Sequence, residues 1–208
     1  MSHERTGLVN IEQRHIDEAT RIAERFPNFT GGCRVLFLIQ RHSDGGHTNN
    51  SKLRSYISRN SEEWIKCLAK LLQEMEFYPE IPLRIYQTIN TRNVDKGIRE
   101  FKKASLDADY LDDNSRQWFY LDVRNRIISA IMQRRCRESG YFLYDCDTKD
   151  EGIMTKIRWA LSELTTILED YPSKNGYHII TKPFNHTLIR LPEEITMSPD
   201  AMMLLKWK

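Results

Sequence analysis

The chain has 208 residues, of which 40% are hydrophobic and 29% are charged. This balance is typical of a folded globular protein with one sizeable core, and it excludes a disordered or fibrous chain. The net charge of +2 neither requires nor excludes a nucleic-acid partner, because a nearly neutral molecule can still carry a basic patch.

No segment of the sequence predicts a membrane span or an export signal. No apolar run approaches the roughly 20 residues that cross a bilayer, and the N-terminal 15 residues lack the apolar core of a signal peptide. The four cysteines have no CxxC spacing, so we expect reduced thiols rather than a zinc site or a disulfide framework. We therefore expect a cytoplasmic protein with no membrane partner.

The first part of the chain alternates between helical and extended patterns. Apolar residues at helical spacing predict a helix over 10–26, and the continuous apolar run over 34–40 predicts a buried strand. The polar, Gly- and Asn-rich segment 41–52 predicts a mobile loop, with a substrate flap as the alternative, and a short extended piece over 54–58 follows. This loop contains Arg41, His42, Asp44 and His47, for which chance metal binding is a further alternative.

A helix, a strand and another helix then complete an N-terminal α/β unit, which we place at residues 1–106. Ser61 is predicted to cap a helix with one apolar stripe. Residues 82–88 alternate as a strand that starts at a proline, and 93–103 predict the next helix. The acidic stretch 107–114 is predicted to be an exposed connection at the boundary of this unit.

The C-terminal part, residues 115–208, predicts a small sheet with helices. In chain order we expect a helix over 115–138, a strand over 141–145, a helix over 152–168, a turn over 171–176, and strands over 177–181 and 201–207. The expected fold class is α/β in the broad sense (α+β), one domain over 1–208 in which the two units pack together. Trp64, Trp118 and Trp159 fall on helical apolar stripes and are expected in the core rather than as base-stacking platforms.

Two aspartates lie at the end of the predicted strand 141–145. Residues i and i+2 of a strand project to the same face, so Asp145 and Asp147 are expected to share one small volume. Close carboxylates repel unless a cation neutralises them, and a hard divalent ion prefers such oxygen ligands. The alternative is a pair of solvated acids, with Asp147 or Thr148 capping the next helix.

A polar turn lies about one helix after these aspartates. Ser173, Lys174 and the nearby glycine would offer an ammonium and backbone amides to phosphate oxygens, and His178 follows on the next strand. The alternative for His178 is a structural histidine whose hydrogen bonds are satisfied within the fold.

The order of these motifs resembles the archaeo-eukaryotic primase superfamily, the catalytic core of small primases and primase-polymerases. That family has an hhhDhD strand, a helix, and a strand with an S-x-H-type motif, and here the similarity covers residues 141–181. The resemblance implies Asp145 and Asp147 as catalytic ligands of Mg²⁺ or Mn²⁺. It also implies that Ser173, Lys174 and His178 contact the incoming nucleotide. The chain would be a small, phage- or plasmid-type member of the superfamily.

The family also places an acidic residue on a later strand, where it acts as a third metal ligand. We assign Asp200 to this role in preference to Glu193 and Glu194, with a turn-forming aspartate after Pro199 as the alternative for Asp200. The spacing from Ser173 to the histidine is longer than in the family motif.

Basic residues outside these motifs are candidates for phosphate contacts. Arg92 is predicted to contact the nucleotide beside a helix N-terminus, with Arg84 and Lys96 as supporting cations. Three arginines on one face of the predicted long helix would follow a nucleic-acid backbone, with a solvated surface as the alternative. These arginines are Arg126, Arg134 and Arg137.

The expected function is therefore template-dependent nucleotidyl transfer, the synthesis of primers or short polymers by a primase. Nucleoside triphosphates and a single-stranded nucleic-acid template are the expected partners, with a helicase or another DNA replication protein as an accessory. The first alternative is a non-catalytic nucleic-acid-binding or regulatory protein on a degenerate primase-like fold. The second is a phosphohydrolase, because the DxDT string at Asp145 also resembles the haloacid-dehalogenase phosphatases.

Overall fold

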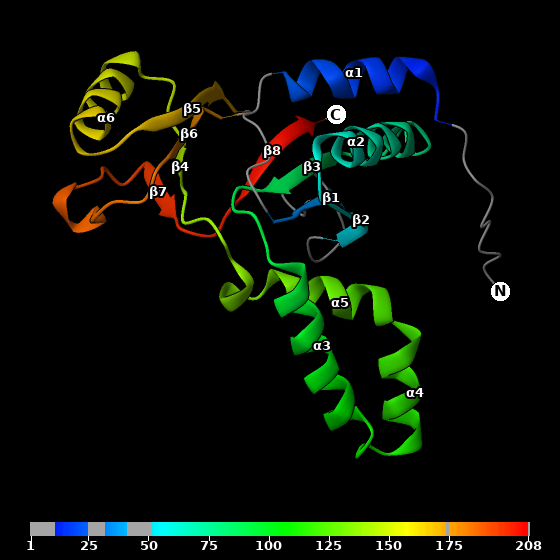
Figure 1. Ribbon diagram of the computed structural model, residues 1–208. Coiled ribbons are helices and arrows are strands. Elements are labelled where there is room, and N and C mark those ends of the chain that lie inside the picture. The colour runs from blue at the N-terminus through cyan, green and yellow to red at the C-terminus, as the bar shows by residue number, and fades with distance from the viewer. Residues whose placement is uncertain (1–10, 25–31, 41–50, 174, 208) are drawn as a thin grey trace.

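The computed structural model describes residues 11–24, 32–40, 51–173 and 175–207. Within these residues the chain forms two four-stranded antiparallel sheets with helices packed on them, which is an α+β architecture (Figure 1). The mixed fold class predicted from the sequence is confirmed. None of the described helices is long and apolar enough to cross a membrane.

The first sheet has the strand order β2-β1-β3-β8. Its strands are β1 (Arg34–Gln40), β2 (Ser51–Ser58), β3 (Leu83–Thr88) and β8 (Met202–Trp207). The strand β8 comes from the far end of the chain and pairs antiparallel with β3. The structure therefore divides the chain differently from the sequence prediction, because the last strand belongs to the N-terminal sheet.

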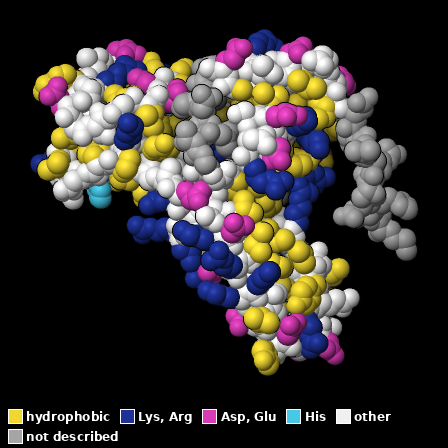
Figure 2. Space-filling view, viewed as in Figure 1, with side chains coloured by type: hydrophobic (Ala, Val, Ile, Leu, Met, Phe, Trp, Pro, Cys, Tyr) yellow, Lys and Arg dark blue, Asp and Glu magenta, His cyan; other side chains and the backbone are white. Residues whose placement is uncertain are grey.

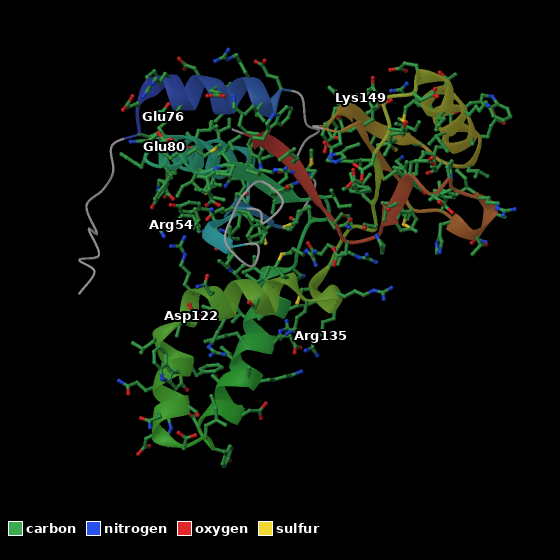
Figure 3. The ribbon with its side chains drawn as sticks, turned by 180° about the vertical axis from the view of Figure 1, so that it is seen from behind. Arg54, Glu76, Glu80, Asp122, Arg135 and Lys149 are labelled. Carbon is green, nitrogen blue, oxygen red and sulfur yellow. The ribbon has the colours of Figure 1, made fainter. Side chains whose placement is uncertain are left out.

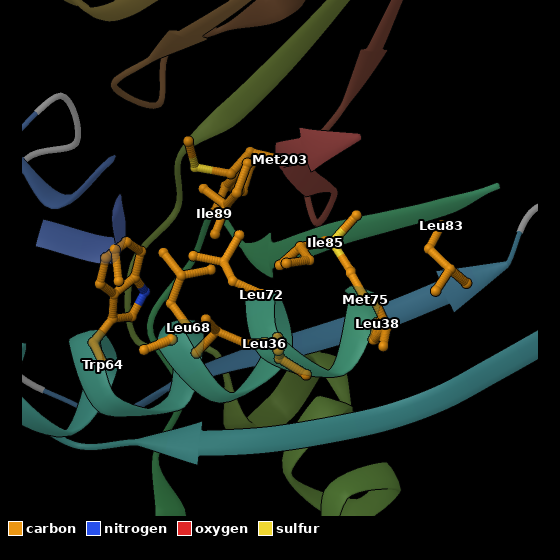
Figure 4. Close-up of a cluster of buried hydrophobic side chains, with 14 of the residues drawn as sticks. Leu36, Leu38, Trp64, Leu68, Leu72, Met75, Leu83, Ile85, Ile89 and Met203 are labelled. Carbon is orange, nitrogen blue, oxygen red and sulfur yellow. The ribbon is translucent and has the colours of Figure 1, made fainter. Parts of the chain in front are cut away.

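Two helices, α1 (Gln13–Ala23) and α2 (Ser61–Glu76), pack side by side over one face of this sheet. Their shared buried cluster, part of which Figure 4 shows, includes Leu36, Leu38, Leu68, Leu72 and Ile85. The cap of α2 is Asn60, whose side-chain oxygen accepts a hydrogen bond from the backbone N–H of Glu63 at 2.8 Å. The predicted cap at Ser61 is therefore wrong by one residue.

The opposite face of the first sheet is covered by α5 (Val123–Met132). The buried residues at this contact include Val35, Phe37, Ile128 and Ile131. Two further helices, α3 (Val94–Ala108) and α4 (Asp113–Leu121), extend away from the sheet beside α5, and we call these three helices the helical arm (Figure 1). Because β1 contributes to clusters on both faces of the sheet, its continuous apolar sequence is explained.

The single long helix predicted over 115–138 is wrong. The chain breaks at Asp122, whose φ of −113° and ψ of 29° lie outside the helical region, so that α4 and α5 are separate. After α5 a 3-10 helix, η2 (Arg134–Cys136), ends this part of the chain. The arginines expected on one continuous helical face are therefore distributed over different elements.

The three tryptophans expected in the core differ in burial. Trp64 is buried in α2, where its indole N–H donates to the side-chain oxygen of Gln87 at 2.7 Å. Trp118 is 71% exposed and Trp159 is 67% exposed, so the prediction is wrong for both. Adjacent helical positions are about 100° apart, and Phe119, next to Trp118, is the buried residue of α4.

The second sheet has the strand order β5-β6-β4-β7. Its strands are β4 (Phe142–Cys146), β5 (Ile167–Pro172), β6 (Tyr177–Thr181) and β7 (Ile195–Ser198). The helix α6 (Glu151–Leu164) packs on one face, and a 3-10 helix, η3 (His186–Leu188), precedes β7. Strand β5 occupies residues for which the end of a helix and a turn had been predicted.

Two buried polar residues after β3 join the two sheets. The Asn90 amide donates to the carbonyl oxygens of Tyr141 at 3.2 Å and Pro199 at 3.0 Å, and its oxygen accepts from the Tyr141 N–H at 2.7 Å. Arg92 donates to the Met132 carbonyl oxygen at 3.1 Å and pairs with Asp200. These contacts hold the segments that precede β4 and β8 in place, and they thereby position the two sheets relative to each other.

Candidate active-site cleft

A cleft of about 730 Å³, its open mouth included, lies between the two sheets, and we call it the inter-sheet cleft. The second sheet contributes Asp145 and Asp147 from the end of β4 and His178 from β6. The first sheet contributes Arg84 and Tyr86 from β3. Three residues that the sequence motifs place at the reaction centre therefore line one cleft.

The alternation of β4 explains why both aspartates reach the cleft. Tyr144 and Cys146 are fully buried against α6, so Asp145 and Asp147 project to the other face, as predicted. The Asp145 side chain is 49% exposed, and Asp147 is exposed as well. The sequence alternative in which Asp147 or Thr148 caps the next helix does not hold, because α6 is capped by another residue.

That cap is Asp150. Its carboxylate accepts hydrogen bonds from the backbone N–H groups of Gly152 at 2.7 Å and Ile153 at 3.2 Å. Since Asp150 satisfies the helix N-terminus, Asp145 and Asp147 are not needed there.

His178 is held between an acid of the cleft and a buried phenol. Its Nε2 lies 3.1 Å from Oδ1 of Asp145, and its Nδ1 lies 3.1 Å from the hydroxyl of Tyr171. The pKa of Tyr171 is raised by burial and by the nearby Asp145 charge, so the phenol keeps its proton and can donate to Nδ1. In the arrangement that satisfies both contacts in this way, Nε2–H donates to Asp145 and Nδ1 accepts from the Tyr171 hydroxyl.

The sequence did not identify Tyr171, because its role depends on strand pairing. It lies on β5 directly opposite His178 in the antiparallel register, and the two rings meet edge to face with centroids 5.2 Å apart. His178 is only 7% exposed and both of its ring nitrogens have partners, which agrees with the structural alternative. One of those partners is a carboxylate of the cleft, so the histidine is also part of the site.

The turn before β6 lies against the end of β4. The hydroxyl of Ser173 accepts a hydrogen bond from the backbone N–H of Gly176 at 3.1 Å, and Ser173 lines the cleft. A Cβ at Gly176 would lie 2.0 Å from the backbone oxygen of Cys146, so only glycine allows this approach. Lys174 lies outside the described residues, as do the loop residues 41–47.

Arg84 brings a positive charge to the opposite wall. It lies on β3 two residues before Tyr86, and its guanidinium donates to the Tyr86 hydroxyl at 3.4 Å. The sequence marked Arg84 only as a supporting cation and did not identify Tyr86. Neither residue belongs to a sequence motif, and only the packing of the two sheets against each other brings them close to the aspartates.

Two predicted site residues are placed elsewhere. Arg92 is 0% exposed and forms an ion pair with Asp200, and neither residue lines the cleft. The nucleotide contact predicted for Arg92 is therefore wrong, because its guanidinium is enclosed by protein acceptors. The metal-ligand role predicted for Asp200 is wrong as well, because its carboxylate pairs with Arg92 and does not line the cleft. The exposed Glu193 and Glu194 do not line the cleft either.

The two carboxylates that line the cleft still fit a divalent cation. Mg²⁺ is commonly held by one or two carboxylates, with water and substrate phosphate completing its shell. Asp145 and Asp147 supply the two carboxylates, and the exposed Thr196 of β7 also lines the cleft, paired opposite Asp145. Among the residues that the structure describes, no group of three acidic, histidine or cysteine side chains is arranged as a metal site.

The three arginines predicted to bind nucleic acid do not form one face. The guanidinium of Arg126 stacks on Phe119 within the helical arm, 4.3 Å from the ring centroid. Arg134 is exposed on η2, and Arg137 donates to the backbone oxygen of Pro199 at 2.6 Å. Arg134 and Arg137 thus lie where the helical arm joins the segment before β8, and Arg126 lies within the arm.

Comparison with known proteins adds no relative to this description: no family model, no curated protein and no solved structure matches the chain.

Proposed function

We propose that this chain is a metal-dependent nucleotidyltransferase that synthesises primers on a single-stranded nucleic-acid template. The observation that carries the proposal is the convergence of Asp145, Asp147 and His178 in the inter-sheet cleft, with Arg84 on the facing wall. Paired carboxylates, a histidine and a cation are the groups that a triphosphate substrate and its metal require.

Asp145 and Asp147 would hold Mg²⁺ or Mn²⁺ in this proposal. When bound, the ion neutralises charge on the triphosphate and lowers the pKa of a coordinated hydroxyl. The two carboxylates are suited to this because both project from one face of β4 and remain accessible to solvent.

The other cleft residues bind and orient the nucleotide. Arg84 supplies positive charge for phosphate oxygens, and Ser173 lines the same cleft from the second sheet. The reaction joins the 3′-hydroxyl oxygen of one nucleotide to the α-phosphorus of the next, while the bond from that phosphorus to the bridging oxygen breaks and pyrophosphate leaves. His178 is oriented by Tyr171 and is aligned with the carboxylate of Asp145.

A second candidate is a non-catalytic nucleic-acid-binding protein on the same fold. One observation favours it: Asp200, the chosen third acid, is paired with the buried Arg92 instead of facing the cleft. In either case the proposed partners are a nucleic-acid strand and other replication proteins. A cytoplasmic location belongs to the same proposal, since all four cysteines are free thiols.

Primer synthesis from labelled nucleoside triphosphates on single-stranded DNA, with Mg²⁺ or Mn²⁺, tests the proposal. We expect product with the unaltered protein and none with Asp145→Asn/Asp147→Asn, which removes two charges but keeps the side-chain shapes. The matched control is Glu193→Gln/Glu194→Gln, which removes two exposed charges outside the cleft and is expected to leave synthesis unchanged. Absence of product with the folded, unaltered protein and supplied replication partners would favour the non-catalytic candidate.

A further inference from the structure

The helical arm carries its charges in two separate groups. Residues 94–103 and 134–136, where the arm joins the rest of the molecule, contain six cations and two acids. Residues 106–122, toward its tip, contain five aspartates and one arginine. Figure 2 shows Lys and Arg side chains gathered at the junction, with acidic and apolar side chains toward the tip. We call the cations at the junction the arm-base patch, which comprises Lys96, Arg99, Lys102, Lys103, Arg134 and Arg135.

The charge within the arm-base patch is only partly neutralised. Glu100 pairs with Arg135 at 2.7 Å and with Lys103 at 3.3 Å, which ties η2 to α3. Lys96, Arg99 and Arg134 are exposed and have no carboxylate partner among the residues that the structure describes. The surface therefore keeps an excess of positive charge that the fold itself does not use.

Helix stability does not explain this arrangement. Lys96 lies in the first turn of α3, where the helix dipole favours acids such as Asp95, and the last turn of α3 has no basic residue. A cation in the first turn weakens the helix slightly, so helix stability does not account for this position.

The arm-base patch is linked to the inter-sheet cleft through the segment before β8. Arg137, directly after η2, donates to the backbone oxygen of Pro199 at 2.6 Å. The residues on either side of that segment, Ser198 and Ala201, line the cleft. Arg135, which Figure 3 labels, lies where the arm joins this segment. The segment before β8 thus connects the rim of the cleft with the base of the helical arm.

We propose that the arm-base patch binds the phosphate backbone of the single-stranded template as it passes the inter-sheet cleft. The identity of the strand as a template rests on the proposed function, whereas the binding itself does not. Exposed Lys and Arg side chains with an excess of positive charge bind backbone phosphates without reading the bases. Binding is therefore independent of sequence and sensitive to salt.

The test compares two variants that each lose three exposed cations. Lys96→Gln/Arg99→Gln/Arg134→Gln alters the patch. The control, Arg21→Gln/Lys70→Gln/Lys156→Gln, alters α1, α2 and α6. Circular dichroism and the thermal midpoint establish that both variants remain folded.

Fluorescence anisotropy with labelled DNA and RNA strands of about 20 nucleotides, over a series of salt concentrations and without nucleotides or metal, measures binding. Each phosphate contact on a single strand contributes about 0.7 to the slope of log affinity against log salt. We expect the patch variant to lose about 2 from this slope and roughly 100-fold in affinity at 0.1 M salt, while the control variant binds like the unaltered protein.

Equal binding by the patch and control variants would overturn the proposal, as would failure of the unaltered protein to bind either strand. Asp145→Asn/Asp147→Asn separates this result from the proposed function, because it is expected to bind the strand and yet make no product. Loss of binding in the patch variant, together with no synthesis by any protein, would support the patch and refute nucleotidyl transfer.

Discussion

The hydrogen bond from Tyr171 to His178 leads to a prediction with a built-in control. Tyr171→Phe removes one buried hydroxyl and leaves Nδ1 of His178 without this partner. His178 is only 7% exposed. A buried polar atom that loses its partner costs about 1–3 kcal/mol. We therefore expect the free energy of unfolding to fall by about that amount in urea denaturation at neutral pH.

Tyr144→Phe is the control, because it makes the same chemical change on strand β4 of the same sheet. Tyr144 is also fully buried, but its hydroxyl has no hydrogen-bond partner among the described residues. Removing that hydroxyl is expected to leave stability unchanged or to raise it by about 1 kcal/mol.

The tautomer of His178 gives a second measurement on the same variants. Nitrogen NMR shifts should report a proton on Nε2 in the unaltered protein and in Tyr144→Phe, and a change in Tyr171→Phe. If Tyr171→Phe is as stable as the unaltered protein, or if both variants lose the same stability, then the proposed role of Tyr171 in orienting His178 is wrong.

Three further changes test other parts of the structure. Arg92→Met should lower the free energy of unfolding by about 3–5 kcal/mol, because it leaves Asp200 without its buried partner; a loss below about 1 kcal/mol in urea would instead indicate a surface arginine. Gly176→Ala should cost roughly 2 kcal/mol or more, since the added carbon would lie 2.0 Å from a backbone oxygen. Gly140→Ala, whose nearest neighbour would be at 3.6 Å, should be tolerated, and equal thermal midpoints for the two glycine variants would contradict this packing. Burial and the nearby Asp145 raise the pKa of Cys146 to about 12. The folded protein should therefore resist alkylation of this thiol at pH 8, whereas the urea-unfolded protein should be alkylated. Mass spectrometry of the modified peptide measures the difference. This raised pKa also makes the thiol contribute stability below pH about 8.5 that is lost as pH rises toward 12.

The sequence predicts the parts of the fold that local patterns determine. The apolar run at β1 and the strand β6 have the predicted bounds, because burial on both faces and strand alternation are visible in single segments. The shared face of Asp145 and Asp147 follows from the same period of two residues. These features do not depend on distant residues.

The features that the sequence did not predict depend on distant contacts. Strand β5 contains Glu169 and Asp170 and ends at Pro172, residue types that are rare in strands, and only its pairing with β6 reveals it. An arginine is expected at the surface, so the burial of Arg92 against Asp200, 108 residues away, has no local signal.

The central claim is that Asp145 and Asp147 form a metal and nucleotide site. Calorimetric titration of the protein with Mn²⁺ and a non-hydrolysable nucleoside triphosphate tests it without requiring catalysis. We expect binding by the unaltered protein and by Glu193→Gln/Glu194→Gln, and a loss of at least about tenfold in affinity for Asp145→Asn/Asp147→Asn, consistent with charged ligands to a hard cation. Equal affinity in all three proteins, or no binding by the unaltered protein, would contradict the assignment of the inter-sheet cleft as the site.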